Sequence, residues 1–348
     1  MKRIFTRTAA AFLAAVLLYP IAASGISAQK AIVMDAETGR VIYEKRADER
    51  SLIASTTKIM TALIVCEQCN VLDRMMIPKE AVGIEGSSMY LEEGEILTIQ
   101  ELLYGLMLSS GNDAAVALAI YCGGTVEGFV QLMNDKARLL ELEGTHFMNP
   151  HGLDAPDHYS TARDLAILSC YAMENPIFAR TVGTKTVRVG QRTLSNHNQL
   201  LWRLDGAEGI KTGYTKAAGR ILVSSVQRSG RRIVMVTIND GDDWQDHKTL
   251  CEQGFGQFKQ VTLVEPGDAL GRIQVLCGTK DSVSVAASQG FSYPVAEGER
   301  VQIFLSSKGF DYAPVAANGD AGFAYICLNG NVIGKIPVHY AETIELQS

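Results

Sequence analysis

The sequence contains no long run of basic residues, and this absence argues against electrostatic capture of a polyanion. Its 32 lysines and arginines are outnumbered by 38 aspartates and glutamates, which gives a formal net charge of −6. We find no low-complexity tract and no clear internal repeat. With 348 residues, of which 47% are hydrophobic and 20% charged, the chain is typical of an ordinary globular protein of two domains. We therefore expect no nucleic-acid partner.

The cysteines also lack the spacing of a metal site or a disulfide framework. There are seven, so they cannot all pair within the chain. Cys66 and Cys69 form a C-x-x-C motif, but it has no second ligand pair and lies in an apolar helical pattern. We expect both to be buried or half-buried thiols, and we expect no metal and no cofactor.

Long hydrophobic segments are missing except at the amino terminus. Basic residues at positions 2, 3 and 7 precede an uncharged stretch, 8–28, which has an apolar centre and then small residues at 22–25. This pattern predicts a signal peptide over residues 1–25 and hence an exported, extracytoplasmic protein. A retained membrane anchor is the alternative, although Pro20 interrupts the apolar segment and the segment is short for a span.

The hydrophobic patterning predicts an α+β fold. Alternating apolar residues indicate a hairpin at 31–43 and two strands at 221–226 and 233–238, whereas helical spacing begins at Ser55. Thr98 and Glu101 form a capping-box pattern. Further helices are expected at about 112–121, 126–140, 161–173 and 244–258. Strands that bracket a helical insertion indicate an antiparallel sheet covered by helices.

The composition changes after about residue 260. Short strand-like runs occur at 272–276, 301–305 and 323–328. We therefore expect a catalytic domain over residues 26–260 and a small β-sandwich domain over residues 261–348.

Three short motifs carry the chemistry: STTK at 55–58, SGN at 110–112 and KTG at 211–213. Ser55 and Lys58 are three residues apart at a predicted helix start, so both side chains lie on one face within reach of each other. A serine becomes a good nucleophile when a neighbour accepts its proton. Lys58 can do this if burial or the charge of Lys211 lowers its pKa.

Each motif alone has an ordinary structural explanation. A serine at a helix start is commonly an N-cap, Gly111 and Asn112 suit a helix-to-helix loop, and a glycine such as Gly213 is common at a strand or turn. Their order, and their placement at a helix start, a loop and a strand, is specific. The set resembles S-x-x-K, S-D-N and K-T-G, the signature of penicillin-binding proteins and class A β-lactamases, with glycine in place of the aspartate here.

Over residues 28–260 the chain resembles the D-alanyl-D-alanine carboxypeptidases, the low-molecular-mass penicillin-binding proteins of serine peptidase family S11. The resemblance extends beyond the three motifs to GSSM at 86–89, GLMLSSGNDAA at 105–115, NPHGL at 149–153, YSTARDL at 159–165 and KTGYTKAAG at 211–219. It implies a serine β-lactamase/transpeptidase-like fold and explains the β-rich carboxy-terminal part.

The resemblance also implies roles for these residues. Ser55 would be acylated by the penultimate D-alanine of a wall peptide, with Lys58 as general base. Ser110 and Asn112 would relay protons and hold the peptide amide. Lys211 and Thr212 would bind the terminal carboxylate of the substrate. Gly213 would allow close approach of the substrate backbone. The backbone N–H groups of Ser55 and Tyr214 would form an oxyanion hole. The implied partners are stem peptides ending in D-Ala-D-Ala and, as inhibitors, β-lactam antibiotics.

The sequence departs from the family pattern at two places. Some relatives hold the substrate carboxylate with two arginines, and here we expect His197, within an Asn-His-Asn segment, and His247 at those positions. Either could serve as a cationic partner. Many relatives also end in an amphipathic helix, but the sequence before Ser348 shows no such pattern. Any peripheral association with the membrane or the wall would then depend on an uncleaved signal peptide or on partners.

Two alternative functions remain open at this stage. A serine β-lactamase would share the motifs, but residues 140–170 contain no glutamate in the E-x-x-L-N context of class A enzymes. A non-catalytic wall-binding protein could keep the fold, although all three motifs are intact.

Overall fold

The computed structural model describes residues 25–306 and 309–348. The expected signal peptide, residues 1–25, therefore lies outside the described residues except for its last position. Among the described residues no single helix is both long and apolar enough to cross a membrane. One bent pair, α3 (Asn112–Gly123) and α4 (Val126–Leu139), which meet at 83°, reaches that standard only by combined length and composition.

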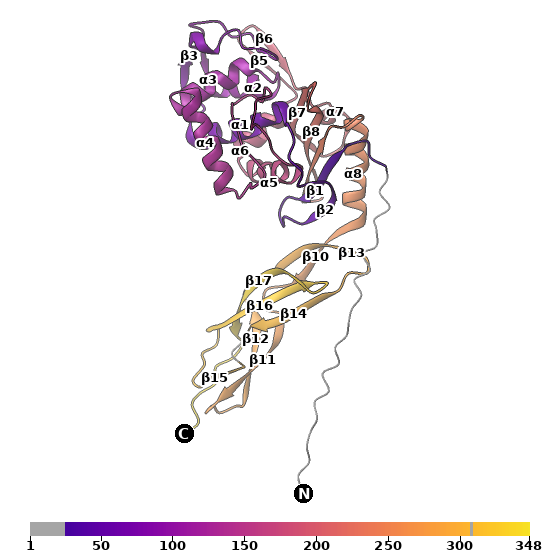
Figure 1. Ribbon diagram of the computed structural model, residues 1–348. Coiled ribbons are helices and arrows are strands. Elements are labelled where there is room, and N and C mark those ends of the chain that lie inside the picture. The colour runs from indigo at the N-terminus through magenta and orange to yellow at the C-terminus, as the bar shows by residue number, and fades with distance from the viewer. Residues whose placement is uncertain (1–24, 307–308) are drawn as a thin grey trace.

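A five-stranded antiparallel sheet forms the centre of the first part of the chain (Figure 1). Its strand order is β2-β1-β9-β8-β7, so the amino-terminal hairpin pairs with strands far along the sequence. The strands are β1 (Lys30–Asp35), β2 (Val41–Lys45), β7 (Ala207–Thr215), β8 (Gly219–Arg228) and β9 (Arg231–Ile238).

Helices cover both faces of this sheet because alternate residues of the central strands are apolar on both sides. In β9, Val234 and Val236 pack into the core shared with helices α1 to α6, whereas Ile233 and Met235 face α8. Figure 1 shows this layering. The helices are α1 (Lys58–Gln68), α2 (Ile99–Met107), α3 (Asn112–Gly123), α4 (Val126–Leu139), α5 (Ala162–Met173), α6 (Pro176–Gly183), α7 (Leu200–Arg203) and α8 (Asp243–Gln257), with short 3₁₀ helices η1 (Ala54–Thr57) and η2 (Lys79–Ala81).

Side-chain caps set several helix starts. Thr98 accepts from the Glu101 N–H and the Glu101 carboxylate accepts from the Thr98 N–H, so the capping box predicted from the sequence is present. Thr125, Thr161 and Asn175 accept in the same way at the starts of α4, α5 and α6. The sequence patterns did not predict α6, α7 or the small hairpins β3 (Arg74–Met76) with β4 (Ile96–Thr98) and β5 (Thr186–Val189) with β6 (Arg192–Ser195).

The carboxy-terminal part is β-rich, as expected. The chain passes directly from α8 into β10 (Phe258–Val264), which pairs with β13 (Phe291–Ala296). A six-stranded sheet has the order β14-β16-β17-β12-β11-β15. Its strands are β11 (Ala269–Leu276), β12 (Ser282–Ala287), β14 (Val301–Ser306), β15 (Phe310–Tyr312), β16 (Asp320–Leu328) and β17 (Asn331–Tyr340). It extends away from the helices around the first sheet (Figure 1) and has its own apolar core, including Val283, Val285 and Ile326.

Candidate active site

Ser55 and Lys58 are neighbours at the junction of η1 and α1. The Lys58 Nζ lies 3.0 Å from the Ser55 Oγ. Ser55 is not a helix cap, because η1 begins after Ile53 and no side chain caps it. The first turn is a 3₁₀ helix rather than the expected α-helix, and it still places both side chains on one side, as the spacing predicts.

The Lys58 amine is fully buried and has two further partners. It donates to the Asn112 Oδ1 at 2.7 Å and to the His151 carbonyl oxygen at 2.6 Å. Burial, and then the nearby charge of Lys211, lower the pKa of Lys58 well below its usual value. A neutral amine has two N–H bonds and one lone pair. Since the two carbonyl-type oxygens take the N–H bonds, the lone pair is left to face the Ser55 hydroxyl, the one partner that can donate.

The loop between α2 and α3 brings Asn112 to Lys58. Ser110 adopts a left-handed conformation, with φ 60°, and Gly111 is the residue that precedes α3. The first residue of α3, Asn112, also donates from its Nδ2 to the Glu85 carbonyl oxygen at 2.6 Å, so both ends of its amide are fixed. Asp113 accepts from the Met89 and Leu91 N–H groups and thereby holds the neighbouring segment against the loop.

A second segment, residues 148–158, closes the other side of Lys58. The Thr61 hydroxyl donates to the Pro150 carbonyl oxygen at 2.6 Å, next to the His151 carbonyl that Lys58 uses. Gly152, with φ +92°, lies directly against residue 54: a Cβ there would stand 1.8 Å from the Ala54 oxygen. This contact accounts for a glycine within the NPHGL segment.

The KTG motif lies in β7, the last strand of the sheet, where it is paired with β8. Thr212, Gly213 and Tyr214 line a cleft of about 630 Å³ together with Ser55 and Ser110. The strand passes so close to η1 that a Cβ on Gly213 would lie 3.3 Å from the Ser55 backbone nitrogen. A side chain at this position would therefore be tight against η1.

Lys211 does not line this cleft. It is 1% exposed, and its Nζ donates to the Thr212 carbonyl oxygen at 2.9 Å. Burial lowers the pKa of Lys211 to about 7. Its charge contributes to the lowered pKa of Lys58.

His197 does reach the cleft, as expected. The Asn196 Nδ2 donates to the carbonyl oxygens of Val182 and Thr184 and so fixes the backbone before His197. The His197 N–H donates to the Leu108 carbonyl oxygen at 3.3 Å, and the residue lines the cleft. Partial burial and the charge of Lys211 lower the pKa of His197. The lowered pKa favours the neutral form of the imidazole ring over the cation that the sequence analysis considered.

The structure places His247 away from the cleft. It is fully buried between α8 and the sheet, with Nδ1 2.6 Å from the Ser224 Oγ and Nε2 3.0 Å from the Thr237 Oγ1. Burial lowers the pKa of His247 to about 3. Because both ring nitrogens are occupied and the ring is neutral, His247 cannot receive a substrate carboxylate, which corrects the expectation from the sequence.

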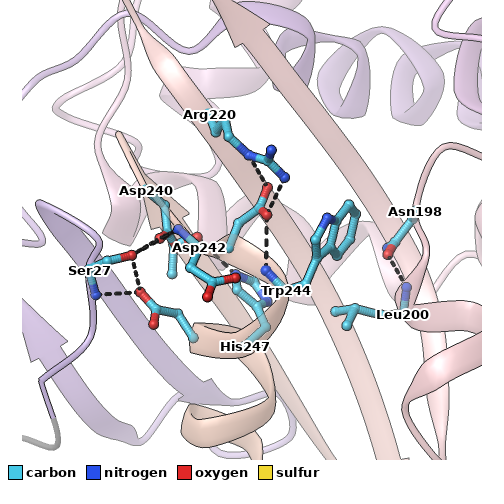
Figure 2. A network of polar contacts seen from close by, with 11 residues as sticks. Ser27, Asn198, Leu200, Arg220, Asp240, Asp242, Trp244 and His247 are labelled. Carbon is cyan, nitrogen blue, oxygen red and sulfur yellow. Dashed lines mark hydrogen bonds and ion pairs between the residues drawn. The ribbon is translucent and has the colours of Figure 1, made fainter.

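The sequence patterns missed a different cation at the cleft, Arg220 on β8. Its guanidinium forms an ion pair with Asp243, with Nη2 2.5 Å from Oδ1 and Nε 3.2 Å from Oδ2 (Figure 2). Trp244 completes this end of the cleft. The signal available in the sequence was weak, because an arginine at a strand start is usually only a solvated surface residue. No group of three or more His, Cys, Asp or Glu side chains within the described residues could hold a metal ion.

Replacing Lys211 with glutamine should raise the pKa of Lys58. The variant removes a nearby positive charge that disfavours protonation of the Lys58 amine. We would measure this pKa by NMR titration of lysine labelled at Cε with carbon-13. Lys216→Gln removes an exposed charge from the turn after β7 and serves as control. An unchanged or lower Lys58 pKa in Lys211→Gln would contradict the electrostatic coupling.

Gly152→Ala should destabilise the protein more than an alanine at a comparable glycine. We expect the free energy of unfolding to fall by about 3 kcal/mol, because the methyl group meets the Ala54 carbonyl in a strained conformation. Gly94→Ala, where φ is +80° but the space is open, should cost only about 1–2 kcal/mol. Equal losses in urea unfolding would show that the Ala54 contact is unimportant.

Two protein-family models and several known proteins match this chain. A family model described as D-alanyl-D-alanine carboxypeptidase matches residues 19–242, and one described as the C-terminal domain of penicillin-binding protein 5 matches residues 258–346. The chain is 30% identical to D-alanyl-D-alanine carboxypeptidase DacF of Bacillus subtilis, over 91% of this chain and 86% of DacF. It is 31% identical to DacC of Escherichia coli, over 93% of this chain and 86% of DacC.

Solved structures agree in fold. Penicillin-binding protein 5 of Haemophilus influenzae superimposes with a TM-score of 0.79 at 29% identity, and the match covers 92% of this chain and 98% of that one. Penicillin-binding protein 6B of Escherichia coli gives a TM-score of 0.75 at 27% identity, covering 90% and 96% of the two chains. The fold is thus the mixed penicillin-binding protein fold with a β-rich carboxy-terminal domain, and the chain belongs to the D-alanyl-D-alanine carboxypeptidases of serine peptidase family S11.

Proposed function

We propose that this protein is a serine-type D-Ala-D-Ala carboxypeptidase that removes the terminal D-alanine from peptidoglycan stem pentapeptides through an acyl-enzyme on Ser55. The observation that carries the proposal is the position of the Lys58 amine. Two carbonyl-type oxygens, those of Asn112 and His151, take its N–H bonds, so its lone pair faces the Ser55 hydroxyl. This arrangement is a nucleophile with its base already in place.

Acylation follows from this geometry. The Ser55 Oγ attacks the carbonyl carbon of the penultimate D-alanine while its proton passes to the Lys58 Nζ. The carbonyl oxygen becomes an oxyanion, which the backbone N–H groups of Ser55 and Tyr214 stabilise. When the peptide C–N bond breaks, the leaving amine needs a proton, and Ser110 on the wall of the cleft relays it from Lys58. Free D-alanine departs.

Deacylation reverses the roles. Water enters the position of the departed D-alanine and attacks the ester carbonyl, and Lys58 accepts its proton. The Ser55 Oγ leaves and is reprotonated, which releases a stem peptide that is one alanine shorter. The buried charge of Lys211 assists both steps, because it keeps the pKa of Lys58 low and returns the amine to its neutral form.

The substrate backbone binds beside β7, because β7 is the last strand of the sheet. Thr212 and the absence of a side chain at Gly213 let an extended peptide approach Ser55. The terminal carboxylate of the peptide is received by the Thr212 hydroxyl, by His197 as a neutral donor, and by Arg220. Two nitrogens of the Arg220 guanidinium bind Asp243, so Nη1 remains for the substrate.

Membership of the family supports action on the cell wall, outside the cytoplasm. The predicted signal peptide supports export to that compartment. By the same resemblance, β-lactam antibiotics acylate Ser55, since they present a strained amide and a carboxylate to the same groups.

The β-lactamase alternative is not favoured. In class A serine β-lactamases a glutamate activates the water that hydrolyses the penicilloyl ester. Among the described residues that line the cleft, Asp243 is the only acid, and Arg220 holds it. A non-catalytic wall-binding role has no supporting observation, because the contacts of Lys58 with Ser55 and Asn112 are intact.

Ser55→Ala should abolish catalysis and covalent labelling. We expect release of D-alanine from a synthetic pentapeptide ending in D-Ala-D-Ala to fall at least 1,000-fold, because no alternative nucleophile faces Lys58. Mass spectrometry of the peptide, and of the protein treated with fluorescent penicillin, measures both effects. Ser195→Ala, an exposed serine on β6, should retain both. A labelled Ser55→Ala protein would disprove the assignment of the nucleophile.

Arg220→Gln should weaken recognition of the substrate carboxylate. We expect kcat/KM for the free-acid peptide to fall about tenfold, because a charge-assisted hydrogen bond is lost. Hydrolysis of the same peptide with an amidated carboxy terminus should change little. Arg228→Gln is the matched control: Arg228 lies on the same strand and is paired with Glu252 on α8, outside the cleft. An equal loss with both peptides would assign Arg220 a structural role only.

A further inference from the structure

One buried histidine is hydrogen-bonded to the short helix that carries the nucleophile. His158 is 1% exposed, and its Nε2 lies 2.8 Å from the Thr57 Oγ1. Thr57 is itself fully buried and is the last residue of η1, between Ser55 and Lys58 in the chain. Neither His158 nor Thr57 is among the residues that line the cleft. Any effect of this pair on the reaction must therefore pass through its neighbours.

The second ring nitrogen of His158 decides which way these hydrogen bonds run. The Met148 N–H donates to Nδ1 at 3.0 Å. Because a backbone N–H can only donate, Nδ1 is the nitrogen without a proton, and Nε2 carries the proton of the neutral ring. Nε2 therefore donates to the Thr57 hydroxyl oxygen. Burial, and then the charge of His146, lower the pKa of His158 to about 4, so the ring is neutral near pH 7.

These two hydrogen bonds anchor the segment 148–158 beside Lys58. Met148 and His158 are the two ends of the segment, so the bond between them closes it into a loop. The bond to Thr57 then attaches this closed loop to η1. Within the loop, the His151 carbonyl oxygen accepts from the Lys58 Nζ at 2.6 Å. The position of that carbonyl thus depends on how His158 holds the ends of the loop.

We propose that His158 is a positioning residue for the acylation of Ser55, because its hydrogen bonds to Thr57 and Met148 hold the His151 carbonyl on the Lys58 amine. This inference rests on the proposed function, since it assigns His158 a task within that reaction. The sequence motifs did not identify His158, because the family-like run YSTARDL begins one residue after it.

The His151 carbonyl matters because the Lys58 amine has so few partners. The Asn112 Oδ1 and the His151 oxygen take its N–H bonds, and this leaves the lone pair to the Ser55 Oγ, 3.0 Å away. If the loop shifts, one acceptor is lost and the lone pair is no longer confined to the direction of Ser55. Proton transfer during acylation should then slow.

Binding of the substrate should not change in the same way. The groups that we assign to the substrate carboxylate include Thr212 on β7 and Arg220 on β8, and neither belongs to the segment 148–158. Loss of His158 should therefore reduce the rate constant of acylation and leave the affinity of the noncovalent complex unchanged. A histidine that only stabilised the fold would not separate these two quantities.

The test follows acylation of the purified protein by fluorescent penicillin after rapid mixing. The dependence on penicillin concentration gives the acylation rate constant at saturation and the dissociation constant of the noncovalent complex. His158→Leu keeps a side chain of similar size without hydrogen-bonding atoms. We expect its acylation rate constant to fall about tenfold and its dissociation constant to stay the same.

A second variant removes the acceptor and leaves the histidine in place. Thr57→Val has the shape of threonine without the hydroxyl, so His158 loses one partner only, and acylation should again slow. The double variant should be no slower than His158→Leu alone, because both changes remove the same hydrogen bond. If both losses multiply in the double variant, the two residues act independently and the proposal is wrong.

Two further variants separate positioning from general stability. His158→Gln keeps a donor and an acceptor and should recover acylation to within about threefold of the unchanged protein. His146→Gln is the matched control, because the His146 Nδ1 is also bonded to the backbone, at 2.7 Å from the Asp157 oxygen, within its own part of the chain. It should acylate at the normal rate. All rates are measured well below the unfolding temperature of each variant.

Several results would overturn the inference. These are an unchanged acylation rate constant in His158→Leu and Thr57→Val, a glutamine variant as slow as the leucine variant, or a dissociation constant that rises in step with the loss of rate. If His158→Leu does not fold, Thr57→Val carries the test alone. The proposed function fails separately, if the unchanged protein is not labelled on Ser55.

Discussion

The rest of the structure depends on the burial of one amine, that of Lys58. An ammonium ion without solvent is costly, and this burial lowers the pKa of Lys58 well below its usual value. Its carbonyl-type partners come from α3 and from the segment around Pro150, and its third neighbour is Ser55. Three distant parts of the chain must therefore meet within hydrogen-bonding distance, and the helices around the sheet bring them there.

This requirement explains features that would otherwise be unfavourable. Ala54 and Ser110 both have positive φ values, at 44° and 60°, immediately beside the reacting groups. Gly152 allows the backbone to pass the Ala54 carbonyl where no side chain would fit. A second buried lysine, Lys211, lies close enough to lower the pKa of the first. The strained backbone and the buried lysines are concentrated near the cleft. Burial of apolar side chains in the cores on the two faces of the sheet stabilises the fold and offsets these local costs.

Much of the fold and of the site could be predicted from the sequence. The helical and alternating patterns predicted most helices and the central strands, because these elements bury one or both faces in the core. The small elements were missed: α7 has four residues and the β5–β6 strands four each, too short for a periodic pattern. The ordered motifs predicted the pairing of Ser55 with Lys58, since three positions along a helical turn fix that distance. For His247 the prediction was wrong, because alignment to a motif cannot tell whether a side chain faces the cleft or the core.

The sequence by itself determined the family and the proximity of Ser55 and Lys58, because these are set by residue identity and short local spacing. Only the tertiary structure decided which charged side chains lie at the cleft. It buried the side chain of Lys211 and brought Arg220 and Asp243 together at the cleft. Such contacts join residues on different elements, and their distances depend on how the helices pack on the sheet, which no pattern along a single segment specifies.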